Sequence, residues 1–321
     1  MSFKPFLGSN ELFELSALKF PLISTIKKDG VRAIIRKGEA FTRSYTSQNL
    51  PVIKNRQIQE LLSTIKLISK TPSEEIIDLE IYIHGLPLNE IVMFTNTEDI
   101  KSREHYNKIK AKVRELTKPF NYYLSVPKEI EFYIFDGTTV GQEYLDYLKR
   151  LEQIYVSSTE NFTIVEPKIL YNIEELQTEY ERVLALGFEG LVIRKPDSPY
   201  KYGRSTFKEH YFLKLKPIEK YEAEIIEINE RMFNYNESTE SYAGYKIKRD
   251  TVDNKEGSGI AATATVKWNN NEFKITLTGT ETERIKIWDN RNSYIGRKLL
   301  FKGMSYGMKN VPRFPTLVKI L

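Results

Sequence analysis

The pattern of apolar residues changes once along the chain, and this change constrains the fold more than any other feature. Through the first two thirds, strand-like apolar runs alternate with segments of helical periodicity. The expected strands are Pro21–Ile26, Val31–Arg36, Ile76–Ile83, Glu131–Phe135, Gly190–Arg194 and Phe212–Lys216. The expected helices are Arg56–Leu67, Asp99–Leu116, Tyr144–Tyr155 and Ile173–Leu186, the last closed by Gly187. This part is predicted to be α+β.

Beyond Pro217 the helical periodicity gives way to strand signals separated by Asn- and Gly-rich turns. The expected strands are Glu222–Asn229, Gly244–Lys248, Ala261–Trp268, Glu272–Thr278 and Lys298–Lys302. The polar stretch Asn234–Gly259 is predicted to be a long surface loop. Short strands without a long helix are typical of a small barrel or sandwich. The length of 321 residues also favours two domains, and we place the boundary near Pro217.

Composition excludes several classes of protein. The chain has no cysteine, which excludes disulfide scaffolds, thiolate zinc sites and cysteine nucleophiles. His84, His105 and His210 are too scattered to form a metal site, so they receive no catalytic role. The first twenty residues do not resemble a secretion signal, and no window approaches the roughly 20 apolar residues that a membrane span needs. We therefore expect a cytoplasmic protein, in the host cell if it is viral, without a membrane partner.

Charge is distributed unevenly. The net charge is only +5, yet the segment after Asp289 contains basic residues and no acidic ones, with aromatic residues between them. Such a segment suits the phosphates of a nucleic acid, because cations that displace condensed counterions bind any sequence. A solvated basic edge is the alternative reading.

The motif Lys27-Lys28-Asp29-Gly30-Val31-Arg32 joins the first two expected strands. By itself, Asp-Gly between strands is an ordinary hairpin turn. The motif gains meaning from five further segments in a fixed order. With them the chain resembles the covalent nucleotidyltransferase superfamily and, within it, the small ATP-dependent DNA ligases of the bacteriophage type. The segments that carry this resemblance are Thr42-Arg43-Ser44, Asp78-Leu79-Glu80, Glu131–Asp136, Glu189–Arg194 and Lys214-Leu215-Lys216.

The resemblance implies a fold and a reaction. The fold would be α+β, with a nucleotidyltransferase domain (an ATP-grasp-like ligase adenylation domain) at residues 1–217 and a small all-β OB-fold domain at 218–321. The protein would be a monomer that seals nicks in double-stranded DNA, using ATP and Mg²⁺. It would form a lysyl-AMP adduct and then 5′-adenylated DNA. The Arg-x-Asp-Lys motif found near the carboxy terminus of larger ligases is absent, so the residue that orients the pyrophosphate is unassigned.

The resemblance also implies roles for individual residues. Lys27 would be the nucleophile, and Glu189 and Glu80 would be the metal ligands. The nucleotide-binding residues would be Thr25, Arg32, Glu80, Phe135, Arg194, Lys214 and Lys216, with Phe135 stacked on the adenine. The DNA-binding residues would be Arg43, Lys201, Arg204, Lys298, Lys302 and Arg313.

The chemistry of these residue types agrees with those roles. A 5′-phosphate must be activated before a 3′-hydroxyl can displace a group from it, and a covalent enzyme–AMP intermediate divides that task into easier steps. A lysine attacks only as the neutral amine, although its ordinary pKa is about 10.4. Burial or a neighbouring cation such as Lys28 would lower the pKa of Lys27, whereas nearby acids would raise it. In an extended strand, Lys214 and Lys216 would lie on one face and neutralise a transferring phosphoryl group.

Three alternatives remain open from the sequence alone. The first is an mRNA-capping guanylyltransferase, which has the same Lys-x-Asp-Gly plan. The second is an RNA ligase, which the Asp29–Arg32 pattern disfavours. The third is a nucleic-acid-binding relative without catalytic activity, which the intact set Lys27, Glu189, Lys214 and Lys216 disfavours.

Overall fold

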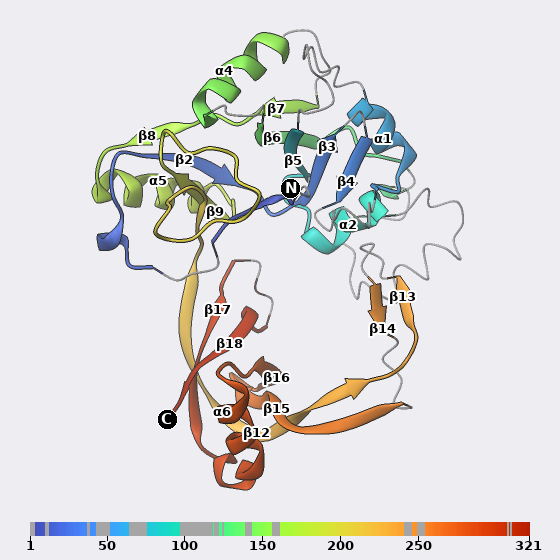
Figure 1. Cartoon of the computed structure of the whole chain (residues 1–321), viewed down its shortest axis with the longest axis vertical. Coiled ribbons are helices and arrows are strands. Elements are labelled where there is room, and N and C mark those ends of the chain that lie inside the picture. The colour runs from blue at the N-terminus through green and yellow to red at the C-terminus, as the bar shows by residue number, and fades with distance from the viewer. Residues whose placement is uncertain are drawn as a thin grey trace. The chain divides into compact units, whose positions relative to one another are not determined.

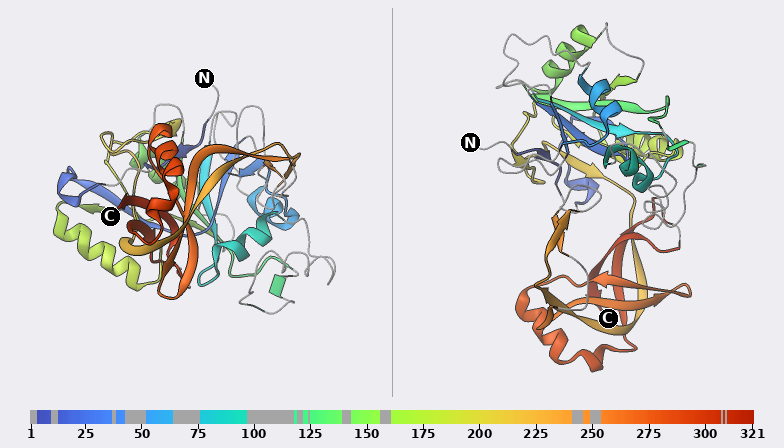
Figure 2. Two further views of the ribbon diagram at one scale, coloured as in Figure 1. Left: turned by 90° about the horizontal axis from the view of Figure 1, so that it is seen from below. Right: turned by 90° about the vertical axis from the view of Figure 1, so that its right-hand side faces the viewer.

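The computed structural model describes residues 4–9, 13–36, 39–42, 52–63, 76–96, 118, 122–123, 125–138, 143–155, 161–240, 246–248, 254–306, 308 and 310–321. Two compact units divide between Leu215 and Lys216. Each unit is described by itself below. Figures 1 and 2 show the elements of both.

The first unit contains two larger sheets, whose neighbouring strands are mostly antiparallel. The first sheet has the order β11-β9-β2-β8. Its strands are β2 (Leu22–Lys27), β8 (Lys168–Leu170), β9 (Gly190–Arg194) and β11 (Leu213–Leu215). The second sheet has the order β4-β3-β5-β6-β7, in which only β7 runs parallel to its neighbour. Its strands are β3 (Val31–Arg36), β4 (Glu39–Thr42), β5 (Ile76–Tyr82), β6 (Glu131–Thr138) and β7 (Phe162–Ile164). The short strands β1 (Phe6–Leu7) and β10 (Gly203–Arg204) pair in parallel.

Helices cover these sheets. They are α1 (Arg56–Ser63), α2 (Leu88–Asn96), α4 (Tyr144–Tyr155) and α5 (Ile173–Ala185), with a 3-10 turn η1 (Leu15–Ala17). Helix α5 packs on β8 and β9, and α4 packs on β6 and β7 (Figure 1). Asn172 caps α5, because its side chain accepts a hydrogen bond from the N–H of Glu175 over 2.9 Å. Gly187, at φ 79°, supplies the left-handed residue that ends the helix.

Several predicted elements match the structure closely. Strands β3 and β9 and helix α4 have the predicted bounds, and α1 begins at the predicted residue. The predicted helix Asp99–Leu116 lies outside the described residues. Apolar side chains from the second sheet and from α1, α2 and α4 form the largest core, in which Ile77, Leu79 and Phe132 are fully buried. Ile34 lies in a separate small cluster with Phe41 and Ile76.

The second unit is a closed five-stranded barrel. The strands follow one another around it in the order β12-β15-β16-β18-β17. They are β12 (Ile218–Asn234), β15 (Lys255–Trp268), β16 (Asn271–Thr276), β17 (Lys298–Met304) and β18 (Arg313–Ile320). Ile225, Ala264 and Phe301 are fully buried in its interior. Five strands closed into a barrel are the arrangement expected of an OB-fold.

Two features of this unit differ from the sequence predictions. The stretch predicted as a long loop, Asn234–Gly259, is partly strand. It includes the end of β12, the start of β15 and the small ladder of β13 (Ser238–Glu240) and β14 (Lys246–Lys248). The predicted strand Gly244–Lys248 overlaps β14, whereas β13 and the start of β15 were not predicted.

The unit also contains a helix that the sequence analysis missed. Helix α6 (Glu281–Asp289) packs on β15 (Figure 2) and leads into a 3-10 turn, η3 (Arg291–Tyr294). A capping box fixes its start, with Thr280 and Glu283 exchanging side-chain-to-backbone hydrogen bonds. This Thr-x-x-Glu spacing was the available signal, but α6 buries none of its residues completely and so shows little apolar periodicity.

Candidate active site

Lys27 ends strand β2, and its ammonium is paired with Glu189. The two meet because β2 and β9 are antiparallel neighbours with Lys27 opposite Gly190. In addition, the N–H of Glu189 donates to the Lys27 carbonyl over 3.2 Å. Lys27 Nζ lies 2.5 Å from Glu189 Oε2, and the two side chains are 20% and 2% exposed. A carboxylate so buried requires a charged or hydrogen-bonding partner, which Lys27 provides.

The pKa of Lys27 is raised from its ordinary value. Burial lowers this pKa, but the carboxylates of Glu189 and Glu80, with a smaller contribution from Asp29, more than offset it. The expected help from Lys28 is not seen, since the Lys28 ammonium is directed to Glu131, 2.5 Å away. Without a nucleotide, Lys27 is therefore an ammonium and must lose a proton before it can attack phosphorus.

Glu80 lies on β5 and meets the motif that contains Lys27. Its Oε1 accepts a hydrogen bond from the N–H of Gly30 over 3.1 Å. Burial raises the pKa of Glu80 to about 7, against the opposing effects of Lys27 and Arg32. Gly30 has no space for a side chain, because a Cβ would stand 2.3 Å from the carbonyl oxygen of Ile81. This close approach is what requires a glycine at this position.

A row of side chains crosses the first sheet beside Lys27. Thr25 on β2 and Lys214 on β11 are both opposite Val192 of β9, so the three side chains lie on one face. Lys27 lies on the same face of β2, two residues after Thr25. Thr25 is buried, and the stem of Lys214 passes over Gly8. The sheet therefore brings together Lys27, Thr25 and Lys214, as the sequence predicts for residues of one site.

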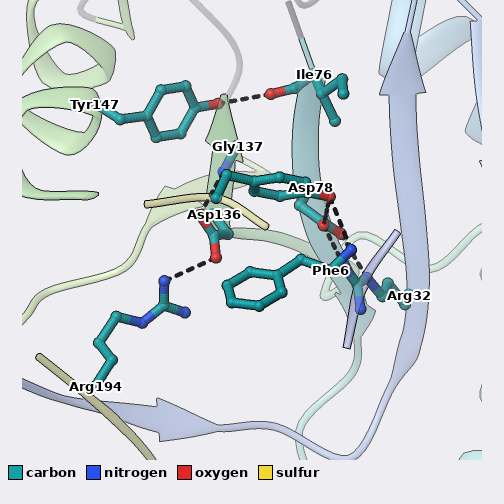
Figure 3. A network of polar contacts seen from close by, with 9 residues as sticks. Phe6, Arg32, Ile76, Asp78, Asp136, Gly137, Tyr147 and Arg194 are labelled. Atoms are coloured by element: carbon teal, nitrogen blue, oxygen red, sulfur yellow. Dashed lines mark hydrogen bonds and ion pairs between the residues drawn. The ribbon is translucent and has the colours of Figure 1, made fainter. Parts of the chain in front are cut away.

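Arg32 and Arg194 are each held by an aspartate (Figure 3). Arg32 forms a two-point ion pair with Asp78, with its Nε 2.6 Å from Oδ1 and its Nη2 on Oδ2. Arg194 Nη1 lies 2.8 Å from Asp136 Oδ2, and the two side chains are 2% and 3% exposed. Register places Asp78 opposite Asp136 on β5 and β6. The two arginines and two aspartates therefore form a buried network with balanced charge.

Part of this network is unsatisfied. Within the described part of the chain, the buried Nε of Arg194 has no hydrogen-bond partner. The guanidinium instead lies over the ring of Tyr144, with its Cζ 3.9 Å from the ring centroid. An unpaired buried donor is uncommon in a folded protein, and a ligand oxygen can satisfy it. This favours a ligand-binding role for Arg194 beyond its ion pair.

Phe135 lies beside this network in a small aromatic cluster. Its side chain is half-buried, and Arg32 Cζ lies 5.4 Å from its ring centroid. Phe6, Val192 and Phe212 form the buried part of the cluster. Figure 3 shows Phe6 between the two arginine–aspartate pairs. The cluster gives Phe135 one apolar flank and leaves part of its ring accessible for stacking.

The predicted DNA-binding residues that the structure describes are divided between the two units. Lys201 is paired with Glu209 over 2.5 Å, and Arg204 Nη1 donates to the Gly8 carbonyl over 2.7 Å, both in the first unit. Lys298, Lys302 and Arg313 lie on β17 and β18 of the second unit, whose first residue is Lys216, predicted to bind nucleotide. Arg43 lies outside the described residues. The roles of all six DNA-binding residues and of Lys216 therefore stay predictions.

Sequence reasoning missed three residues of the site. It assigned no role to Asp78 or Asp136, although both interrupt apolar strands. A carboxylate at a buried strand position is a signal for a charged partner. It also missed Tyr200, whose hydroxyl donates to Asp78 Oδ2 over 2.8 Å. Tyr200 belongs to a loop that only the tertiary fold brings to β5.

Neither a cluster of metal ligands nor a membrane-spanning helix is found among the described residues. Among these residues, no group of three or more His, Asp or Glu side chains is arranged to hold a metal ion without help from a ligand. No helix in the described ranges is long and apolar enough to cross a membrane.

Comparison with known proteins gives one family match. Residues 11–216 match the family described as the ATP dependent DNA ligase domain. This range contains Lys27, Glu80, Glu189 and Lys214.

Solved structures with similar chains include several ligases. A Chlorella virus DNA ligase-adenylate is 25% identical over 99% of this chain and 98% of that chain, with a TM-score of 0.48. A Lig E DNA ligase is 18% identical over 98% of both chains, with a TM-score of 0.61. A structure named Pmar-Lig is 15% identical over 99% of this chain and 67% of that chain, with a TM-score of 0.64. The last two likenesses concern the fold alone, and they confirm the predicted α+β architecture with its all-β barrel.

Proposed function

Since the chain belongs to the ATP-dependent DNA ligase family, which matches more than half of its residues, we propose that it seals nicks in duplex DNA. The proposed reaction proceeds through a lysyl-AMP intermediate. Residues 1–217 are the adenylation domain in this proposal, and residues 218–321 are the OB-fold domain. The observation that carries it is the pairing of Lys27 with buried Glu189, close to Glu80.

In the first step, the neutral amine of Lys27 attacks the α-phosphorus of ATP. A phosphorus–nitrogen bond forms, the bond from the α-phosphorus to the pyrophosphate oxygen breaks, and the nitrogen's proton is released. The raised pKa of Lys27 means that an ammonium has to be deprotonated first. Neutralisation of the Glu189 and Glu80 carboxylates would lower the pKa of Lys27, because these are the two groups that raise it most.

In the second step, AMP moves to the 5′-phosphate of the nick. The phosphorus–nitrogen bond breaks, a bond between the two phosphates forms, and Lys27 takes up a proton again. In the third step, the 3′-hydroxyl attacks the activated 5′-phosphorus, AMP leaves, and the hydroxyl proton is released. The net result is one phosphodiester bond for each ATP converted to AMP and pyrophosphate.

The other site residues bind the nucleotide in this proposal. Phe135 stacks on adenine, and Thr25 contacts the base from the sheet face that also carries Lys27. Arg194 offers its unpaired Nε, and Arg32 offers the part of its guanidinium left outside the Asp78 pair. Lys214 and Lys216 neutralise the α-phosphate as charge spreads over its oxygens.

The carboxylates of Glu80 and Glu189 fit a magnesium ion. Each raises the pKa of Lys27, and Glu189 also raises the pKa of Glu80, so two mutually repelling carboxylates lie close together. Mg²⁺ commonly binds through one or two carboxylates together with water and substrate phosphates, which agrees with the absence of a larger acidic cluster among the described residues. When bound, the ion would neutralise phosphate charge.

Nicked double-stranded DNA is the proposed partner of a monomeric protein. In the first unit, Arg43, Lys201 and Arg204 are assigned to the DNA, and on the barrel Lys298, Lys302 and Arg313. Their charges bind phosphates without reading sequence, so the affinity falls as salt concentration rises. The proposed location is the cytoplasm, and repair, replication and recombination of DNA are the processes in which a nick-sealing enzyme serves.

One experiment tests this proposal. The pure protein is incubated with Mg²⁺, α-labelled ATP and a nicked duplex, and the products are separated on denaturing gels. A labelled protein, labelled 5′-adenylated DNA and a sealed strand are expected, and Lys27→Ala should lose the adduct while still binding the nick. Labelling by GTP alone would indicate a capping guanylyltransferase, and sealing only of strands with ribose at the nick would indicate an RNA ligase. Sealing by Lys27→Ala, or DNA binding without any adduct, would refute the mechanism.

A further inference from the structure

Lys28, the residue after the nucleophile, fills a cage of three aromatic rings. Its Nζ lies 4.1 Å from the ring centroid of Tyr133, 5.2 Å from that of Tyr82 and 5.8 Å from that of Phe188. We call these three rings the aromatic cage. The side chain of Lys28 is only 8% exposed, and its single carboxylate partner is Glu131, at 2.5 Å, within the described part of the chain.

The three rings and the carboxylate of Glu131 favour a positively charged side chain at this position. Lysine is rarely buried unless its charge is compensated, and burial lowers the pKa of Lys28 despite the opposing effect of Glu131. The negative faces of aromatic rings attract a desolvated ammonium. Rings on three separate segments, together with a carboxylate, therefore hold a charge that would otherwise be directed to water.

Each wall of the aromatic cage adjoins a residue of the candidate active site. Phe188 directly precedes Glu189, the partner of Lys27. Tyr82 lies two residues after Glu80, on the same face of β5. Tyr133 of β6 is the register partner of Glu80. A change at Lys28 therefore acts on the segments that carry both carboxylates facing Lys27.

Lys28 lies in a short segment between the end of β2 and Gly30. It directly follows the last residue of β2, and Gly30 two residues later is locked against β5. With Lys28 anchored in the aromatic cage on one side, the adjacent Lys27 is directed to the other, toward Glu189. The anchor limits how far the Lys27 backbone can rotate.

We propose that Lys28 is a positioning residue for self-adenylation, with its caged ammonium fixing the direction of the Lys27 amine relative to the α-phosphate. This inference rests on the proposed function. Lys28 itself touches neither nucleotide nor DNA. Small misplacements of a reacting group lower rates steeply, and about 1 Å can cost about a hundredfold.

The decisive variant is Lys28→Met, which keeps the length and apolar stem of the side chain but removes the charge. The maximal rate of adduct formation, per folded molecule, is expected to fall about tenfold, equivalent to about 1.4 kcal/mol. Because Lys28 does not contact ATP, the KM for ATP should change less than about twofold. Lys28→Arg, which restores a cation that stacks on rings, should recover most of the rate.

Two controls separate positioning from general damage. Lys19→Met makes the same chemical change at an exposed lysine and should leave the rate unchanged. Sealing of a pre-adenylated nick does not require attack by Lys27, so Lys28→Met should slow it less than about threefold. If Lys28→Met does not fold, Glu131→Gln replaces it, because this change weakens the anchor at a side chain that is one-quarter exposed.

Each outcome decides the inference. An adduct rate for Lys28→Met within about twofold of wild type would overturn it, as would equal slowing of adduct formation and of pre-adenylated nick sealing. Failure of the wild-type protein to form any adduct is a different result, which would refute the proposed function and not the role of Lys28 alone.

Discussion

The pairing of Lys27 with Glu189 predicts the direction and size of a pKa change in the ligand-free protein. The perturbation is Glu189→Gln, which removes a charge but keeps the shape of the side chain and the main-chain hydrogen bond to the Lys27 carbonyl. Because a carboxylate favours the ammonium, its removal must lower the pKa of Lys27.

The magnitude follows from the geometry. Charges about 4 Å apart interact by about 4 kcal/mol at an effective dielectric constant of about 20. Each pKa unit corresponds to about 1.36 kcal/mol, so an interaction of about 4 kcal/mol corresponds to about 3 units. Lys27 is one-fifth exposed, and Glu80 still faces it after the substitution. We therefore expect the pKa of Lys27 to fall by about 1 to 2 units.

The assay is trace acetylation of the ligand-free protein across a pH series, with the modified peptides quantified by mass spectrometry. The midpoint of labelling reports the pKa of each amine, since only the neutral form reacts. Lys19, an exposed lysine in the same samples, serves as the internal reference, and its labelling should be the same in both proteins. A midpoint for Lys27 that stays constant or rises in Glu189→Gln would refute the electrostatic account of the site.

Three further predictions concern stability and DNA binding. Gly30→Ala would place a Cβ 2.3 Å from a main-chain oxygen of β5 and should destabilise the fold by about 1–3 kcal/mol in urea unfolding, whereas Gly85→Asn, at φ 74° in open space, should change little. Because the pKa of Glu80 is raised to about 7, the native state binds the extra proton and wild type loses stability as pH rises through that value. Between pH 5 and pH 8, Glu80→Gln should therefore gain unfolding free energy relative to wild type, by at most about 3 kcal/mol, and a constant difference would contradict this. Lys298→Ala combined with Lys302→Ala should reduce the salt dependence of nick binding by about 0.9 in log–log slope for each lost phosphate contact, and an unchanged slope would remove these residues from the interface.

Local patterns were sufficient to predict most elements of the first unit. In β3 and β9, apolar and β-branched residues form short runs that end at charged or turn residues, so their bounds follow directly from the sequence. The bounds of α4 follow from its helical periodicity. Helix α6 was missed because a helix on the barrel surface needs only a narrow apolar contact. Strand β14 falls within the predicted strand Gly244–Lys248, whereas its partner β13 was missed because three residues are too few to show alternation.

The residues of the candidate site likewise divide into those that the sequence could predict and those whose partners only the structure reveals. Lys27, Glu80 and Glu189 could be predicted from the sequence, because each is a charged residue within or next to an apolar strand. Each also belongs to a motif of known order. Sequence could not show that Arg32 and Arg194 are held by Asp78 and Asp136, because these pairs join strands that are distant in the chain.

The sequence by itself determined which side chains are the candidates for the proposed chemistry, since a lysine without any cysteine competitor, paired acidic residues and a fixed motif order are local properties. Only the tertiary structure decided the protonation of Lys27 and the place of Lys28. A pKa depends on the charges and solvent around a group, and strand pairing, not sequence distance, sets those surroundings. It brings Glu189 to Lys27 across 162 residues and three rings around the ammonium of Lys28.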